Sequence, residues 1–187
     1  MTLGSWQTKS SKIVYENPFM VVHEDQVIMP NGQPGIYGYI DSKSDSVYAV
    51  PVDKDGNTYI VQQERYTLGK KTWECVAGRT DGQPPMSAAK RELLEETGLE
   101  TGDITILGDV QVANGISTFK STFCIARDLA KATDVLDQVD GILGVKKLPL
   151  SSLPERILAG EIICSQSIAA FFMAIAYLGK TEETLHI

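Results

Sequence analysis

Short runs rich in β-branched and aromatic residues occupy positions 11–50, with turn signals between them, a pattern typical of antiparallel strands. The turn signals are Asn17-Pro18 and Pro30-Asn31-Gly32. The runs themselves lie at 13–15, 19–22, 26–29 and 35–40. The pattern predicts a small antiparallel β lobe at residues 1–45, followed by the main domain at residues 46–187.

Beyond residue 46 the hydrophobic pattern predicts both strands and helices, so the expected fold class is α/β. An apolar run, a turn at Asp53-Lys54-Asp55-Gly56 and a second run predict a β-hairpin. Strands are expected at 47–52, 58–62, 104–112 and 118–126, and helices at 86–97, 153–159 and 165–178.

The helix predicted at 86–97 has an unusual distribution of charge. Met86, Ala89 and Leu93 are three and four residues apart and predict an apolar stripe. Glu92, Glu95 and Glu96 have the same spacing, and we expect their carboxylates to gather on another face. Gly98 follows the last helical position, where a left-handed cap is expected.

Two interpretations of the three carboxylates remain open from the residues alone. A solvated face would tolerate them, because each like-charge pair costs only about 0.2–0.5 kcal/mol. Alternatively, carboxylates without His or Cys beside them are the ligands that Mg²⁺ and Mn²⁺ prefer. A turn-rich segment at 79–85 precedes the helix, and this strand–loop–helix layout would bring backbone carbonyls against the carboxylates.

Composition narrows the class of protein. The 187 residues are 43% hydrophobic and 22% charged, as in an ordinary globular protein, and the net charge of -7 argues against a general nucleic-acid surface. No apolar run reaches membrane-spanning length, and the first residues lack a secretory signal, so we expect no membrane partner and a cytoplasmic location. The three cysteines include no CxxC pair, which favours reduced thiols.

The stretch from residue 78 to 99 resembles the signature of the Nudix hydrolases, a Gly, a loop and then Arg-Glu-apolar-x-Glu-Glu-x-Gly-apolar. The matching residues are Gly78, Arg91, Glu92, Leu93, Glu95, Glu96, Gly98 and Leu99. The loop is one residue shorter than the family pattern, and Pro84 stands where the family has a Glu. The resemblance implies a Nudix-type α/β/α sandwich with a mixed sheet and, here, an altered loop.

The resemblance also implies a cofactor and its ligands. Glu92 and Glu96, helped by the backbone carbonyl of Ala77, are expected to hold Mg²⁺, with Mn²⁺ as the other possible ion. Glu95 would be a third ligand or the base that orients water. Arg91 is expected to orient the carboxylates through charge-assisted hydrogen bonds.

Further residues are assigned to substrate binding by the same resemblance. Arg65 ends a segment like the family's Val-x-Gln-x-Arg-aromatic element, and Arg79 directly follows Gly78. Gly115 matches the glycine of the family's Ser-Pro-Gly-x-x-x-Glu loop, and Phe119 replaces its Glu. Where relatives often carry a catalytic Glu the chain has Asp140-Gly141-Ile142, which leaves Asp140, and Asp137 near it, as the acidic candidates.

The N-terminal segment is similar to that of the ADP-ribose pyrophosphatase branch, in which this lobe builds a homodimer and contributes to the nucleotide pocket. The implied activity is Mg²⁺-dependent hydrolysis of a small nucleoside diphosphate-linked substrate, with ADP-ribose giving AMP and ribose 5-phosphate. Two alternatives remain: another sugar nucleotide such as GDP-mannose, or a degenerate Nudix fold that senses a nucleotide without cleaving it.

Overall fold

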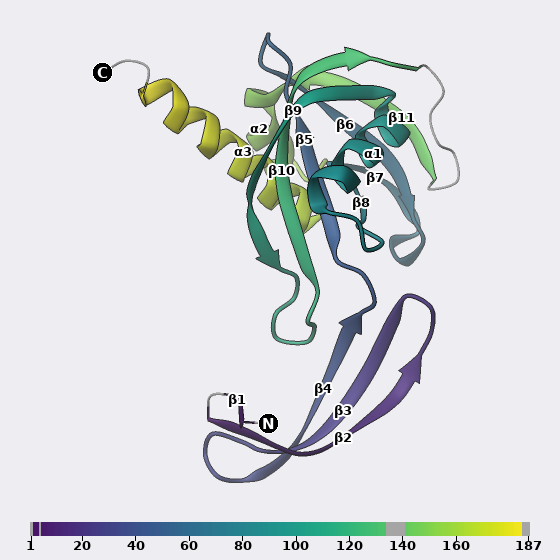
Figure 1. Cartoon of the computed structure of the whole chain (residues 1–187), viewed down its shortest axis with the longest axis vertical. Coiled ribbons are helices and arrows are strands. Elements are labelled where there is room, and N and C mark those ends of the chain that lie inside the picture. The colour runs from purple at the N-terminus through teal and green to yellow at the C-terminus, as the bar shows by residue number, and fades with distance from the viewer. Residues whose placement is uncertain (1, 4, 134–140, 185–187) are drawn as a thin grey trace. The chain divides into compact units, whose positions relative to one another are not determined.

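The computed structural model describes residues 2–3, 5–133 and 141–184 and contains both helices and sheets, so the α/β prediction is confirmed (Figure 1). The chain divides into two compact units. The first contains Met1–Asp45 and Gln111–Lys120, and the second contains Ser46–Val110 and Ser121–Ile187. The sequence did not indicate that 111–120 belong with the N-terminal lobe.

The N-terminal unit is one antiparallel sheet in the order β1-β2-β3-β4. Its strands are β1 (Thr2–Leu3), β2 (Trp6–Glu16), β3 (Met20–Ile28) and β4 (Pro34–Ser42). The expectation of separate strands at 19–22 and 26–29 is wrong. The polar residues between them remain extended because Glu24 and Asp25 pair with Gly38 and Tyr37 of the neighbouring strand β4.

The second unit contains two sheets, ordered β8-β5-β10-β9 and β11-β6-β7. The first is mixed, because β5 runs parallel to β10 and antiparallel to β8. The strands are β5 (Ser46–Pro51), β6 (Asn57–Arg65), β7 (Lys70–Glu74), β8 (Val76–Arg79), β9 (Leu99–Gln111), β10 (Lys120–Lys131) and β11 (Ile142–Pro149).

The helices are α1 (Pro85–Thr97), α2 (Leu153–Leu158) and α3 (Ser165–Thr184), with short 3-10 turns at Tyr66–Leu68 and Leu150–Ser152. Gly98 ends α1 in the left-handed conformation with φ 68°, and its N–H donates to the Leu94 carbonyl, as the sequence predicted. Within the described residues, no helix is both long and apolar enough to span a membrane.

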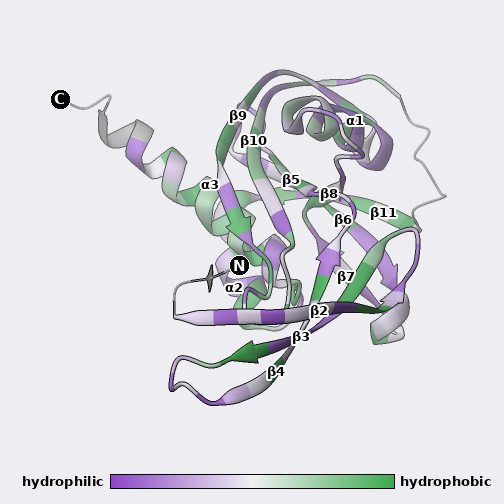
Figure 2. Cartoon of the chain, turned by 60° about the horizontal axis from the view of Figure 1, so that its bottom comes forward, coloured by the Kyte–Doolittle hydropathy of each residue, from purple (hydrophilic) through white to green (hydrophobic). Residues whose placement is uncertain are grey.

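Two hydrophobic clusters lie on opposite faces of the mixed sheet, because alternate residues of a strand point to opposite sides. On β10, Cys124 and Ala126 belong to the cluster that includes α1, whereas Phe123 and Ile125 belong to the cluster that includes α3. The mixed sheet is therefore covered by α1 on one face and by α3 on the other. Hydrophobic positions recur along its strands (Figure 2).

Candidate active site

The carboxylates of Glu92 and Glu96 do not lie on a face apart from the apolar stripe, so the expectation of a separate carboxylate face is wrong for these two residues, and the solvated-face interpretation does not apply to them. Glu92 and Glu96 are 3% and 1% exposed, and they lie on the packed side of the helix with Ala89 and Leu93. Positions 88, 92 and 96 form a row four residues apart beside the row of 89 and 93, so both rows face the sheet. Met86, expected in the apolar stripe, is 44% exposed, and Ala88 is buried in its place.

Glu92 fits against the backbone of β8 because residue 78 is a glycine. A Cβ atom built on Gly78 would lie 2.0 Å from Glu92 Oε1 and 2.1 Å from its carboxyl carbon. Any larger residue would push the carboxylate away from the strand. The glycine of the signature is therefore required here for space.

Glu96 is held by two donors from different strands. The Nε2 atom of Gln63 on β6 donates to Oε1 at 2.9 Å, and the Ala77 N–H on β8 donates to Oε2 at 3.1 Å. Since its acceptor lies on α1, this N–H is directed toward α1 and not toward β5, as is possible for a residue of an edge strand such as β8. Because the N–H and C=O of one residue in an antiparallel ladder face the same side, the Ala77 carbonyl also faces away from β5.

Arg91 connects the carboxylates to the loop before the helix. Its guanidinium lies 2.8 Å from Glu92 Oε1 and donates to Glu95 Oε2 at 2.9 Å and to the Arg79 carbonyl at 2.8 Å. Burial opposes the charge of Arg91, but the two carboxylates outweigh it and raise the pKa of the guanidinium above its usual value. The arrangement fixes Glu92 and Glu95 by charge-assisted hydrogen bonds.

The donor set fits a hard divalent cation. Carboxylate oxygens of Glu92 and Glu96 lie beside the backbone of residues 77 and 78, with no nitrogen or sulfur ligand among the contacts described above. Glu95 is half-buried and turned to Arg91. Across the described residues, no group of three or more His, Cys, Asp or Glu side chains is arranged to hold a metal ion by itself.

Arg65, predicted to bind substrate, is paired with a buried carboxylate. Its Nε and Nη2 atoms donate to the two oxygens of Glu74 at 2.8 and 2.6 Å. Burial of Glu74 opposes its charge, but hydrogen bonds from Arg65 and Thr72 outweigh this and lower the pKa of the carboxyl. Arg65 remains 42% exposed, so part of its side chain faces solvent.

The other predicted residues are distributed over both units. Arg79 lies beside the helix entry, where its Nε atom is 3.1 Å from Asp81. Gly115 and Phe119 belong to the N-terminal unit. Asp137 and Asp140 lie outside the described residues.

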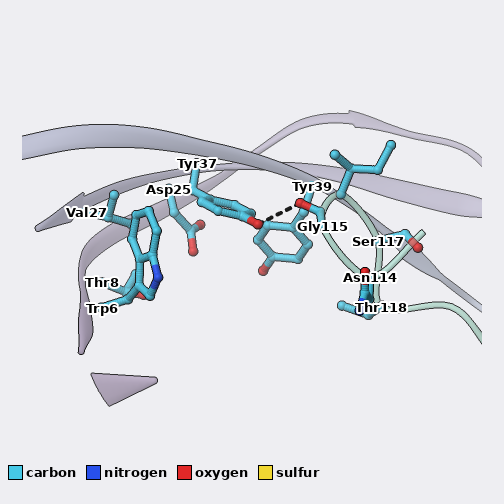
Figure 3. A pocket seen from close by; sticks show the side chains of 11 residues that line it. Trp6, Thr8, Asp25, Val27, Tyr37, Tyr39, Asn114, Gly115, Ser117 and Thr118 are labelled. Atoms are coloured by element: carbon cyan, nitrogen blue, oxygen red, sulfur yellow. Dashed lines mark hydrogen bonds between the residues drawn. The ribbon is translucent and has the colours of Figure 1, made fainter. Parts of the chain in front are cut away.

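Gly115 lines a pocket of about 360 Å³ in the N-terminal unit (Figure 3). Its carbonyl accepts a hydrogen bond from the Tyr37 hydroxyl at 2.6 Å, and the Trp6 ring meets the Tyr37 ring edge-on with centroids 5.3 Å apart. Tyr39 also lines this pocket, and burial followed by the charge of Asp25 raises its pKa. Aromatic walls of this kind suit a flat ring.

Two residues with clear structural roles in the site were missed by sequence reasoning. Gln63 contacts Glu96, and Glu74 anchors Arg65. Both are polar residues at buried positions of strands, where a polar group requires a partner. The signal in the sequence was the place of Gln63 as the Gln of the Val-x-Gln-x-Arg element. Cys75, next to Glu74, is no nucleophile at neutral pH because burial and then the charge of Glu96 raise its pKa well above the usual value.

Buried carboxylates on a helix, set against the glycine of an edge strand, define an oxygen-donor site of the kind that metal-dependent hydrolases use. Comparison with known families agrees: residues 43–161 match the NUDIX domain, and residues 6–40 match the nucleoside diphosphate sugar hydrolase N-terminal domain. The chain belongs to the Nudix hydrolase family and is a pyrophosphohydrolase.

Similar proteins cover most of the chain. It is 32% identical to an ADP-ribose pyrophosphatase of Mycobacterium tuberculosis (strain ATCC 25618 / H37Rv), over 90% of this chain and 83% of that protein. It is 25% identical to a methanol dehydrogenase activator of Bacillus methanolicus, over 96% of each chain. A crystal structure of an ADP compounds hydrolase has the same fold, with a TM-score of 0.85, 19% identity and coverage of 97% of this chain and 98% of that one.

Proposed function

We propose that this protein hydrolyses ADP-ribose to AMP and ribose 5-phosphate with Mg²⁺, or Mn²⁺, as its cofactor. The observation that carries the proposal is the burial of two carboxylates beside β8, Glu92 against Gly78 and Glu96 against the Ala77 N–H. Arg91 is one positive charge among three carboxylates, and a divalent cation supplies the further positive charge that offsets the cost of burying Glu92 and Glu96. Similarity to the mycobacterial enzyme supports ADP-ribose as the substrate.

The residues of the site have separate roles in this proposal. Glu92 and Glu96 hold the cation, together with the Ala77 carbonyl. When bound, the cation neutralises the diphosphate and activates water for attack. Arg91 keeps Glu92 and Glu95 in position, so that Glu95 can serve as a further ligand or accept a proton from the water.

Arg65 and Arg79 are the residues proposed to bind the diphosphate of the substrate. Arg79 is a cation beside the helix entry, and Arg65 is held by Glu74 with part of its side chain in solvent. A planar guanidinium matches two phosphate oxygens, so both residues suit a diphosphate.

The metal site is tested with Glu92→Gln and Glu96→Gln. Each should lower ADP-ribose turnover by about 100-fold or more, because each removes a charge that stabilises the transition state through the cation. Circular dichroism should show that both variants still fold. Glu100→Gln, an exposed position just beyond the same helix, is the matched control and should retain full activity. Full activity in both site variants would place the metal elsewhere.

The choice of substrate needs a separate screen. ADP-ribose, GDP-mannose and related nucleoside diphosphates should be compared at equal concentration with and without Mg²⁺. The highest kcat/KM is expected for ADP-ribose. Preference for GDP-mannose would retain the chemistry and change the substrate, whereas binding without turnover would identify a nucleotide sensor.

We also propose that the N-terminal unit forms a homodimer and contributes the pocket around Gly115 to nucleotide binding. Apolar side chains of this unit support the proposal, since several are more than half exposed: Ile13, Tyr15, Phe19 and Ile36. Phe119 is half-buried in the same unit and remains a candidate for packing or base stacking. Light scattering at micromolar concentration should give the mass of two chains, and a single-chain mass would exclude the shared pocket.

A further inference from the structure

Of the two polar atoms of the Gln63 amide, only the nitrogen has a hydrogen-bond partner among the described residues. Its nitrogen donates to Glu96 at 2.9 Å, and the residue is 5% exposed. Within the described part of the chain, its buried Oε1 atom has no hydrogen-bond partner. A buried acceptor without a partner destabilises a fold, so its presence beside a carboxylate calls for an explanation.

The orientation of this amide follows from its partner. Ionised Glu96 only accepts hydrogen bonds, so the amide nitrogen must face it, and turning the amide over would set two acceptors against each other. The oxygen is thereby fixed on the other side of the same amide group. Glu96 also receives the Ala77 N–H, so Gln63 and β8 hold the carboxylate from two directions.

We propose that Gln63 completes the cation site, with its N–H fixing Glu96 and its amide oxygen serving as a donor to the divalent cation or to a water that the cation carries. This inference rests on the proposed metal-dependent function. Amide oxygens are ordinary ligands of hard cations. The proposal explains both why the amide is buried and why its oxygen has no partner within the described chain.

The test is the affinity for Mn²⁺ alone, measured by electron paramagnetic resonance without substrate. Gln63→Met keeps the length of the side chain and removes both amide atoms, so the Kd for Mn²⁺ should rise about 10-fold or more. Gln63→Glu keeps an oxygen donor for the cation but removes the N–H and places a second carboxylate beside Glu96, so its Kd should rise less than that of Gln63→Met. Gln62→Met, at the neighbouring and less buried position of β6, is the matched control and should not change the Kd.

Thermal unfolding without metal separates a site effect from a folding effect. Gln63→Met should unfold at a lower temperature than the Gln62→Met control, because the buried carboxylate of Glu96 loses one of its donors, but it should remain folded at the temperature of the Mn²⁺ measurement. If Gln63→Met does not fold, Gln63→Asn, whose shorter amide cannot reach both partners, replaces it with the same expected loss of Mn²⁺ affinity.

The outcomes are distinct. Unchanged Mn²⁺ binding by Gln63→Met would overturn the proposal, and equal losses in Gln63→Met and Gln63→Glu would reduce Gln63 to a donor that positions Glu96. If wild-type protein binds no Mn²⁺, or if Glu96→Gln binds it normally, the metal site assumed in the proposed function is wrong. A larger loss of Mn²⁺ affinity in Gln63→Met than in Gln63→Glu supports the oxygen as a donor.

Discussion

The two long helices of the Nudix unit are buried in different ways. The packed face of α3 is apolar, with Ala170, Phe171 and Ala174 all 0% exposed. Its one buried polar side chain among the described residues, Ser167, accepts the Cys75 N–H at 3.0 Å. The packed face of α1 instead combines small apolar residues with the carboxylates of Glu92 and Glu96.

This difference separates residues that stabilise the fold, on α3, from residues that serve the reaction, on α1. Apolar burial on α3 contributes about 25 cal/mol for each Å² removed from water and needs no specific partner. The carboxylates on α1 lose hydration on burial and are retained only because donors such as Arg91, Gln63 and the Ala77 N–H are in place. We therefore expect substitutions on α3 to change stability and substitutions around α1 to change activity.

The largest effect is expected at the centre of the α3 face. Phe171→Ala should lower the free energy of unfolding by about 3–5 kcal/mol, because it removes a fully buried ring and leaves a cavity. Denaturant titration measures this, and the kcat of the folded fraction should be unchanged. The neighbouring Phe172→Ala, at a position 45% exposed, is the control and should cost much less. Equal losses at the two positions would show that this face is not the stabilising one.

Gly78→Ala should lower activity more than stability, which is the reverse of the result expected for Phe171→Ala. The added methyl group would lie 2.0 Å from Glu92 Oε1, so the carboxylate must move, and a displacement of about 1 Å lowers turnover by about 100-fold. The free energy of unfolding should fall by less than in Phe171→Ala, at about 1–3 kcal/mol.

Gly144→Ala on β11 controls for the loss of a glycine, because no described atom lies within 4 Å of a Cβ built there. It should keep its activity. If Gly78→Ala were as active as Gly144→Ala, the close approach of Glu92 to β8 would have no catalytic importance.

Features that depend on local spacing could be predicted from the sequence. The limits of α1 and its cap at Gly98 follow from residues within one or two helical turns, and they agree with the structure. The carboxylate patch was recognised, but its burial was not, because helical spacing places residues on faces without saying which face meets a sheet. The error at Met86 has the same cause.

Contacts between distant segments could not be predicted. Gln63 reaches Glu96 across 33 positions, and Ala77 reaches it across 19. Both contacts depend on β6 and β8, strands of two different sheets, lying beside the same helix, which follows from the packing of the two sheets and not from any local pattern. The glycine of the signature could be matched by resemblance, but its steric reason required the position of Glu92.

The smallest effect is expected outside both helices, at Asp140. If α1 supplies the groups that move protons, Asp140→Asn should change the maximal rate of ADP-ribose hydrolysis by less than about 3-fold, well below the range typical of a general base. Initial-rate kinetics over a range of substrate concentrations measures kcat and KM separately. A strong fall in kcat at unchanged KM would instead assign the base to Asp140, since that pattern marks an interaction made only in the transition state. Pairing this variant with Glu95→Gln makes the comparison decisive, because an active Asp140→Asn together with an inactive Glu95→Gln would locate the base on α1.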